Sequence, residues 1–328
     1  MMSDFYYTAK NPCDKILVKR RFNDMNTFEK AKKFIYRNAR PLDLARWQYH
    51  FENGSREAVL SALSYYQNED GGFGHGLEPD FLNPNSTPIA TWAATEILNE
   101  TELTDKNHPV VKGILRYLES GADFDTEHAQ WLNTVPSNND YPHAVWWEYN
   151  SSPDNFRYNP TAALAGFILK FAEHDSQIYS KALEIAAQAA EWFINSVPFE
   201  EQHITGCFIA LHKYLSQTDI KPEYMDMLER RLKEQVKNNI CPEKEKWETE
   251  YVTKPSDMMI TRDSIFYEDN AEIAKYECGF IKKTQLPDGS FPVPWQWYNE
   301  YKEYEVAANF WRSAIIIKNM LYLKGHGE

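Results

Sequence analysis

The most promising acid pair in the sequence is Glu78 and Asp80, in the segment Leu77-Glu78-Pro79-Asp80. Glu78 precedes a proline, which favours an extended backbone, and in an extended segment residues two apart project to the same side. Two carboxylates that face one cavity can divide acid and base roles when their surroundings separate their pKa values. We therefore predict Glu78 and Asp80 as catalytic residues. The alternative is that Asp80 has only a turn or capping role.

A second group of candidates lies in one long loop and consists of His143, Trp146, Trp147 and Glu148. Histidine titrates near neutral pH, and tryptophan offers flat faces for a sugar ring, a polyene or a cation. We predict His143 as a third catalytic residue, with Trp146, Trp147 and Glu148 as substrate-binding residues. The alternative is a loop that its own aromatic side chains fold back over the core.

An aromatic loop and an arginine extend the predicted substrate-binding set. The segment Phe291-Pro292-Val293-Pro294-Trp295-Gln296-Trp297-Tyr298 cannot be a regular helix or a central strand. It therefore forms a rigid loop that presents Trp295 and Trp297. Arg312 lies in an apolar helical stretch, where a buried guanidinium needs an anionic partner. Glu78 and Asp80 are the expected partners, and a purely structural ion pair is the alternative.

His75, from the glycine-rich segment before Glu78, completes the predicted substrate-binding residues. The remaining histidines and the cysteines show no metal-ligand spacing, and no phosphate loop or dinucleotide fingerprint is present. The sequence therefore predicts no metal and no cofactor.

Helical periodicity covers most of the chain, while strand signals are nearly absent. Apolar segments such as the one from Pro160 alternate with amphipathic segments such as the one from Ile178. This alternation predicts an all-α fold, a single α/α toroid of five or six helical hairpins with inner and outer layers. We expect a loosely docked leader over 1–26 and one toroid domain over 27–328. The predicted helices are 27–38, 42–51, 55–67, 88–100, 108–120, 160–173, 178–196, 204–216, 222–238, 269–284 and 304–323.

One glycine-containing turn occurs twice, as Gln67-x-x-Asp70-Gly71-x-Phe73 and as Gln285-x-x-Asp288-Gly289-x-Phe291. We predict a structural role for both copies, in which the glutamine caps a neighbouring helix and the phenylalanine packs between hairpins. In a toroid of sequential hairpins, every connection from an outer to an inner helix opens at the same end. We therefore expect Glu78, Asp80, the His143–Trp147 segment, Trp295 and Arg312 to converge on one mouth of the bore.

The two turns resemble the Gln-Trp repeats of the terpenoid cyclase and protein prenyltransferase superfamily, with phenylalanine in place of tryptophan. Ser86-Thr87-Pro88-Ile89-Ala90-Thr91 resembles the segment that opens an inner helix in those proteins. Pro142-His143-Ala144-x-Trp146-Trp147 and Asn159-Pro160-Thr161-Ala162-Ala163 are similar to blocks of uncharacterised bacterial prenyltransferase-like proteins. The resemblance covers the chain from about Ser55 onward and implies the toroid fold. The superfamily's Asp-x-Asp-Asp, Asp-Asp-x-x-Asp and zinc-binding Asp-x-Cys motifs do not occur here, so the resemblance implies no activity.

Charge and composition limit the kinds of partner and the cellular location that we expect. The formal net charge of −13 argues against a nucleic-acid surface and against binding to anionic membranes. No apolar run is long enough to span a bilayer, no signal peptide is recognisable, and the four cysteines are expected to be reduced thiols. We expect a cytoplasmic protein with a small-molecule partner, either apolar or carbohydrate.

The sequence leaves three functions open. The first is an enzyme that acts on an isoprenoid or other apolar substrate in an aromatic-lined, acidic central cavity. The second is a carbohydrate-active hydrolase or lyase that uses the paired carboxylates. The third is a non-catalytic binding or scaffolding toroid.

Overall fold

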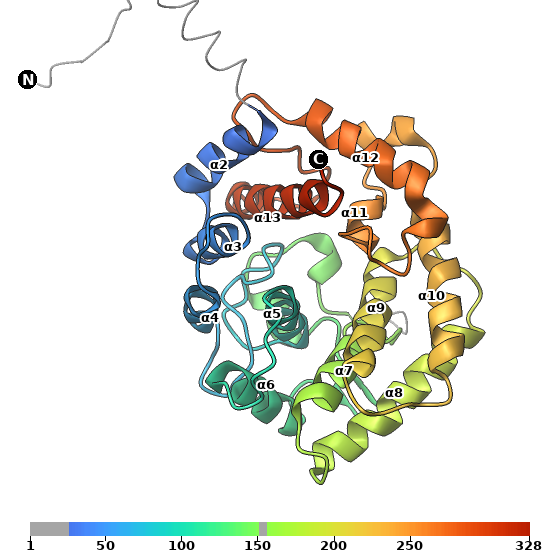
Figure 1. The fold of residues 1–328 in the computed structure, drawn as a ribbon. Coiled ribbons are helices and arrows are strands. Elements are labelled where there is room, and N and C mark those ends of the chain that lie inside the picture. Colours follow the sequence, from blue (N-terminus) through green and yellow to red (C-terminus); the bar gives the residue numbers. More distant parts are fainter. Residues whose placement is uncertain (1–25, 151–155) are drawn as a thin grey trace, which may run out of the picture.

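The computed structural model describes residues 26–150 and 156–328. Most of this part of the chain is helical, as Figure 1 shows, which confirms the predicted all-α class. Residues 1–25, nearly the whole of the predicted leader, lie outside the described residues. Asn26 is the N-cap of the first described helix, where its side chain accepts a hydrogen bond from the Glu29 amide at 2.9 Å.

The helices follow the predicted order, and most of their bounds agree with the predicted ones to within two or three residues. They are α2 (Thr27–Asn38), α3 (Pro41–Phe51), α4 (Arg56–Ser64), α5 (Pro88–Glu100), α6 (Pro109–Glu119), α7 (Thr161–Phe171), α8 (Gln177–Asn195), α9 (Gln202–Ser216), α10 (Met225–Asn239), α11 (Pro255–Met258), α12 (Ala271–Thr284) and α13 (Tyr304–Gly325). Short 3₁₀ helices cover Pro136–Asp140, Val145–Trp147, Lys244–Glu248 and Glu268–Asn270. Two antiparallel strands, β1 (Phe124–Asp125) and β2 (Gln130–Trp131), pair with each other.

Alternate helices along the chain form a connected inner series. Helix α5 packs on α7, α7 on α9, α9 on α11, and α11 on α13, which also packs on α2 and α3. In Figure 1 these five helices lie toward the middle of the view, and α4, α6, α8, α10 and α12 lie around them. The guanidinium of Arg46 on α3 joins the series to α5, because it binds the Glu100 carboxylate at 2.5 Å.

Burial follows the predicted alternation between apolar and amphipathic helices. In α7 every residue from Thr161 to Leu169 is buried, as a helix packed on several sides requires. In α8 the polar stripe that includes Glu184, Gln188 and Glu191 is exposed, while the opposite face is buried. One continuous hydrophobic cluster extends from Ala31 on α2 to Leu323 on α13.

The two glycine turns have the same hydrogen bonds. Gln67 donates through Nε2 to the glycine carbonyl of its own turn at 2.9 Å and to the Val110 carbonyl at 3.1 Å. Gln285 makes the same pair of bonds, at 3.0 Å to its own turn and at 2.8 Å to the Thr27 carbonyl. Each glutamine therefore attaches its turn to the first turn of a neighbouring helix, α6 in one case and α2 in the other.

The glycines of these turns permit a close approach to that helix. Gly71 and Gly289 have φ values of 98° and 99°, which disfavour residues with a Cβ atom. A Cβ on Gly71 would lie 2.0 Å from the Gly113 carbonyl oxygen, and a Cβ on Gly289 would lie 2.1 Å from the Lys30 carbonyl oxygen. The first turn also ends α4 at Ser64 rather than at the predicted residue 67, because the residues that follow join the turn.

Glu277 on α12 is an acid inside the core, with only 1 % of its surface exposed. Its carboxylate accepts hydrogen bonds from the Ser256 amide at 2.8 Å and from the Ser256 hydroxyl at 2.6 Å. Burial raises the pKa of Glu277 to about 7, and the neighbouring charge of Asp257 acts in the same direction. The folded protein therefore retains a proton on Glu277 in a pH range where the unfolded chain releases it.

This proton makes the free energy of unfolding depend on pH with a known sign. Because the pKa is raised in the folded state, the stability that Glu277 contributes is lost as the pH rises from 4.5 toward 7. Between pH 5 and pH 8 we expect the wild-type protein to lose about 2 kcal/mol more stability than the Glu277→Gln variant. Urea denaturation of both proteins at the two pH values measures the difference. Parallel changes in the two proteins would contradict the prediction.

Candidate active site

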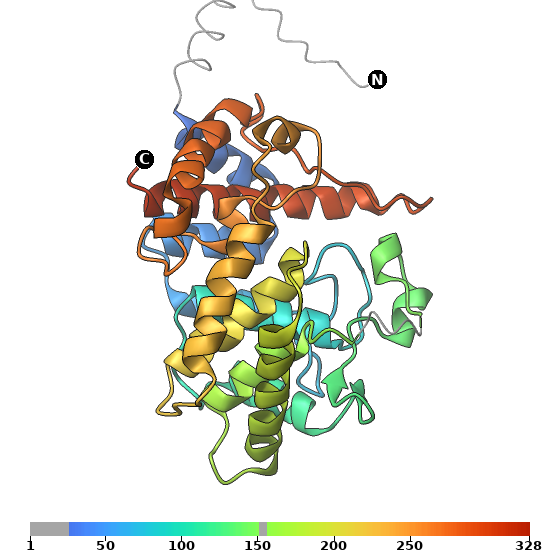
Figure 2. The same cartoon turned by 90° about the vertical axis from the view of Figure 1, so that its right-hand side faces the viewer.

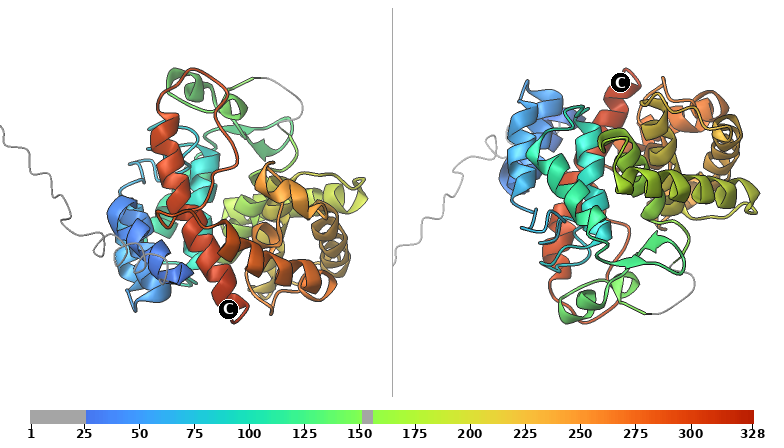
Figure 3. Two further views of the ribbon diagram at one scale, coloured as in Figure 1. Left: turned by 90° about the horizontal axis from the view of Figure 1, so that it is seen from above. Right: turned by 90° about the horizontal axis from the view of Figure 1, so that it is seen from below.

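Three loops meet on one side of the molecule, to the right in Figure 2. They precede α5, α7 and α13, and we call them the first, second and third loops: 65–87, the described part of 120–160, and 285–303. The Ala144 amide in the second loop donates to the Asp80 carbonyl in the first at 2.8 Å. The Val145 amide donates to the Trp297 carbonyl in the third at 3.3 Å. Both views in Figure 3 show the second and third loops beside each other.

Asp80 lies at the junction of these loops, with 3 % of its surface exposed. Its Oδ1 accepts a hydrogen bond from the Trp297 indole at 2.8 Å, and its Oδ2 accepts one from the Trp295 indole at 3.1 Å. Burial raises the pKa of Asp80, while the indole N–H groups of Trp297, Trp311 and Trp295 oppose the rise. Both carboxylate oxygens therefore have donors, and Asp80 binds the third loop to the first.

Glu78 is the second acid at this junction and is only half-buried. Its Oε2 accepts a hydrogen bond from the Asp80 amide at 2.7 Å. Burial and the adjacent Asp80 charge raise the pKa of Glu78 well above its ordinary value, against the opposing charge of Arg40. The environment thus favours a protonated Glu78 carboxyl beside a carboxylate that is held by indoles.

Aromatic rings surround the Asp80 carboxylate. Trp295 packs edge-to-face against Trp311 at 5.2 Å and against Tyr251 at 5.3 Å between ring centroids. The Trp311 indole N–H adjoins the same carboxylate, but it is buried without a hydrogen bond of good geometry. We call Trp295, Trp297, Trp311 and Tyr251 the aromatic cluster; it combines the third loop, α13 and the segment before α11.

Polar groups from α9 extend the aromatic cluster. The Tyr251 hydroxyl lies 3.0 Å from Nε2 of His203 and 2.5 Å from Nε2 of Gln202. Oε1 of Gln202 is buried without a partner. The N-terminal turn of α9 therefore contributes a tyrosine-centred hydrogen-bond network to the same region.

A further acid, Glu96, lies on α5 and was not among the predicted residues. Burial raises its pKa to about 7, while Lys213 opposes the rise. Trp92 lies one turn earlier on the same helix, and Oε1 of Glu96 is buried without a hydrogen-bond partner. The spacing of Trp92 and Glu96, four residues apart on one helix, is a signal that the sequence does contain. Tyr251 and His203 carry no comparable signal.

The two predicted histidines have roles in loop structure. Nε2 of His75 lies 2.8 Å from Oδ1 of Asn68, and the His75 side chain is exposed. His143 is buried, with Nδ1 2.6 Å from the Tyr141 carbonyl oxygen, and its backbone pairs with Phe81. His143 therefore lies beside Asp80 in the fold, but its ring nitrogen is hydrogen-bonded to the backbone and not to either acid.

Of the predicted residues after His143, Trp147 is half-buried and the other two are exposed. Trp147 packs edge-to-face against Phe81 at 5.2 Å, as expected of a loop that aromatic residues fold onto the core. Trp146 is 41 % exposed and contacts Tyr298 at 6.4 Å between ring centroids. Glu148 is exposed at the end of the same 3₁₀ helix.

The expected ion pair between Arg312 and the two acids was wrong. Within the described residues Arg312 forms no ion pair with Glu78 or Asp80. It lines a groove together with Lys30, Lys33 and Arg37 of α2, whereas the preceding residue, Trp311, adjoins the Asp80 carboxylate. Successive residues of a helix are about 100° apart, so the helical position that brings Trp311 to Asp80 directs Arg312 elsewhere.

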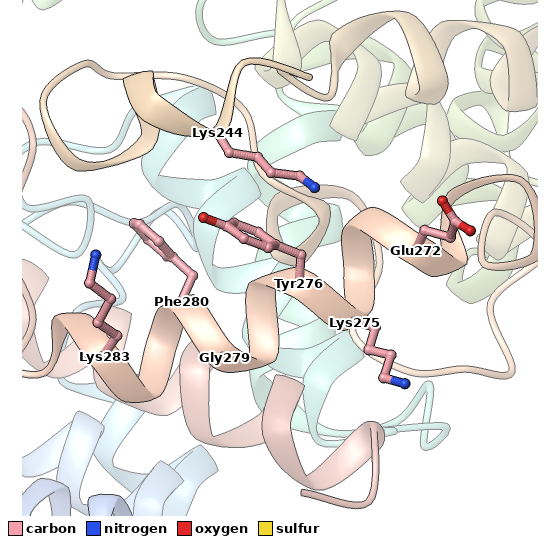
Figure 4. Close-up of a pocket in the computed structure, with 7 residues that line it drawn as sticks. All are labelled: Lys244, Glu272, Lys275, Tyr276, Gly279, Phe280 and Lys283. Atoms are coloured by element: carbon pink, nitrogen blue, oxygen red, sulfur yellow. The ribbon is translucent and has the colours of Figure 1, made fainter.

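Another pocket, of about 520 Å³, lies on the outer face of α12 and contains none of the predicted residues (Figure 4). Tyr276 and Phe280 form its aromatic wall, and the Lys244 ammonium lies 4.3 Å from the Tyr276 ring centroid. Between these rings, a Cβ on Gly279 would meet no atom within 4 Å. This pocket is separate from the three-loop junction.

Among the described residues, no group of three or more His, Cys, Asp or Glu side chains has a geometry that could hold a metal ion. Among the described helices, none is both long enough and apolar enough to cross a membrane. Cys207, Cys241 and Cys278 are free thiols.

Comparison with known proteins adds no assignment, because no family model, no curated protein and no solved structure matches the chain.

Proposed function

We propose that the chain is an α/α toroid of the terpenoid cyclase and prenyltransferase type and that it is an enzyme working by acid catalysis. Two observations support the toroid. The inner series α5, α7, α9, α11 and α13 is connected helix by helix, and α13 continues it to α2 and α3. The two glycine turns, which resemble the superfamily's repeats, attach to neighbouring helices through the same hydrogen bonds.

The single observation that carries the catalytic proposal is the different environment of the two acids. Both oxygens of Asp80 are engaged by indole donors, so Asp80 is a positioning residue. Glu78 has one oxygen bound to the Asp80 amide, and its pKa is raised well above the ordinary value. A carboxyl whose pKa is raised keeps its proton to a higher pH than an ordinary one, which suits it to be a general acid.

The aromatic cluster favours an apolar, isoprenoid-like substrate. In the proposed step, the Glu78 O–H bond breaks and its proton forms a C–H bond with one carbon of a substrate double bond. The double bond supplies the electron pair, which leaves a cation on the adjacent carbon. The π faces of Trp295, Trp311 and Tyr251 stabilise that cation. The Glu78 carboxylate that remains keeps its hydrogen bond from the Asp80 amide.

A carbohydrate-active enzyme is the second candidate, and one observation favours it. Trp146 and Tyr298 are 41 % and 73 % exposed and contact each other at the rim of the junction, as a sugar-binding platform would. The occupied oxygens of Asp80 count against a mechanism that uses paired carboxylates. A non-catalytic binding protein remains the third candidate.

The test compares wild-type protein with the Glu78→Gln variant, whose amide oxygen can still accept the Asp80 hydrogen bond. Farnesol and squalene serve as isoprenoid probes, and cellotetraose and xylotetraose as carbohydrate probes. We expect an isoprenoid probe to quench tryptophan fluorescence equally in both proteins and to be converted only by the wild type. The loss of rate in Glu78→Gln is expected to be about 100-fold or more. The wild-type rate should fall as the pH rises, because the protonated Glu78 is the acid.

Glu127→Gln is the matched control, since Glu127 is an exposed carboxylate of the second loop. It should leave both the rate and the fluorescence response unchanged. Conversion of a carbohydrate probe alone would replace the first candidate by the second. Binding without conversion of any probe, or an unchanged rate in Glu78→Gln, would reject Glu78 as the acid.

A further inference from the structure

A groove of about 340 Å³ lies between α2, the second glycine turn and the N-terminal half of α13. Four basic side chains line it: Lys30, Lys33, Arg37 and Arg312. Asp288 is the one acid among its lining residues. This concentration of positive charge is unexpected in a chain whose formal net charge is −13.

Three of these four basic side chains have no acidic partner among the described residues. Within residues 26–150 and 156–328, no ion pair involves Lys30, Arg37 or Arg312. Oδ1 of Asp288 already accepts hydrogen bonds from the Ser290 amide at 2.9 Å and from the Ser290 hydroxyl at 2.7 Å. Like charges that converge without a counter-ion repel each other, and a bound anion relieves that repulsion.

The walls of the groove are fixed by the fold. The Asn309 side chain on α13 donates to the Asn38 carbonyl at the end of α2 at 3.0 Å. On the other side, the Gln285 side chain attaches the second turn to Thr27 at 2.8 Å. The basic residues thus project from elements that are connected to one another, which is the preorganisation that binding requires.

We infer that this groove binds a small phosphate-bearing anion with two or more negative charges. The guanidinium groups of Arg37 and Arg312 present planar pairs of N–H donors that match phosphate oxygens, and the two lysines supply further charge. The volume suits a small molecule. The site is distinct from the Glu78 junction and does not depend on the proposed function.

Calorimetric titration of the full chain with sodium pyrophosphate tests the inference, against sodium chloride of equal ionic strength and against citrate. We expect saturable binding of pyrophosphate, with affinity at least tenfold weaker in Arg37→Gln and in Arg312→Gln. Asp288→Asn keeps the acceptor for Ser290 but removes the negative charge, and it should strengthen binding several-fold. Arg230→Gln, an exposed substitution on α10, is the matched control and should bind as the wild type does.

Arg230→Gln separates specific binding in the groove from a general effect of charge. If only the net charge mattered, Arg230→Gln would weaken pyrophosphate binding as much as Arg37→Gln or Arg312→Gln does. Circular dichroism confirms that each variant is folded before titration. The inference is overturned if pyrophosphate gives no more heat than sodium chloride, if Arg312→Gln binds it as tightly as the wild type, or if citrate binds equally well.

Discussion

We expect the Gly71→Ala and Gly289→Ala variants each to lose about 3 kcal/mol or more of stability. Both glycines have φ near 100°, and an added Cβ would lie about 2 Å from a backbone carbonyl oxygen of a neighbouring helix. A backbone atom cannot rotate away as the end of a flexible side chain can. Either the turn must leave the helix, which breaks the glutamine hydrogen bonds, or the helix must move within a packed core. Guanidinium denaturation of each variant measures the loss.

Gly279→Ala is the matched control, because it makes the same chemical change where the structure has room. Gly279 lies inside α12, and its added Cβ would meet no atom within 4 Å. Alanine is the better helix former, so this variant should gain up to about 1 kcal/mol. If Gly289→Ala were as stable as Gly279→Ala, the close approach at the second turn would be disproved.

Asp80→Asn should cost about 2–3 kcal/mol, because an asparagine side chain cannot accept both indole hydrogen bonds. Its amide oxygen can receive one N–H group, from Trp297 or from Trp295, while its amide nitrogen would face the other. One buried indole donor is then left without a partner. We therefore expect the third loop to become more mobile while the helices stay folded.

Two measurements separate local loosening from general unfolding. Hydrogen exchange should accelerate in residues 291–299 and remain slow in α7, which is buried along nearly its whole length. Tryptophan emission should shift to longer wavelength as Trp297, now 1 % exposed, meets water. The Glu127→Gln variant should change neither observable. Unchanged exchange in residues 291–299 would show that Asp80 does not hold the third loop.

The helices could be predicted closely from sequence because their signals are local. Thr27–Asn38 and Pro88–Glu100 were predicted to the residue, since Asn26 and Thr87 are N-caps that accept hydrogen bonds from the first turn. The short helix Pro255–Met258 was not predicted, because four residues carry no periodicity. Its place depends on Glu277, which receives the Ser256 hydrogen bonds from a distant part of the sequence.

The candidate site was accessible to sequence reasoning only in part. The proximity of Asp80 and Trp295 followed from the expected common end of the connecting loops, and the 3.1 Å hydrogen bond between them agrees with it. The different surroundings of Trp311 and Arg312 did not follow, because the rotation of α13 relative to distant segments is set by packing and not by its own sequence pattern. The contact of Tyr251 with Trp295 joins two loops of irregular structure, for which no periodic rule exists.

The second glycine turn has a consequence for how the protein is made in the cell. Its glutamine binds the Thr27 carbonyl across 258 residues of sequence, so α2 is synthesised long before its partner. At ribosomal rates of about 5–20 residues per second, α2 waits for about 13–50 seconds. During that interval its apolar face, which includes Phe34 and Ile35, has no C-terminal surface to cover it. The nascent chain therefore exposes this apolar face to chaperones until the last helices leave the ribosome. A truncation that removes α13 leaves the part of the face that α13 covers exposed in the finished protein.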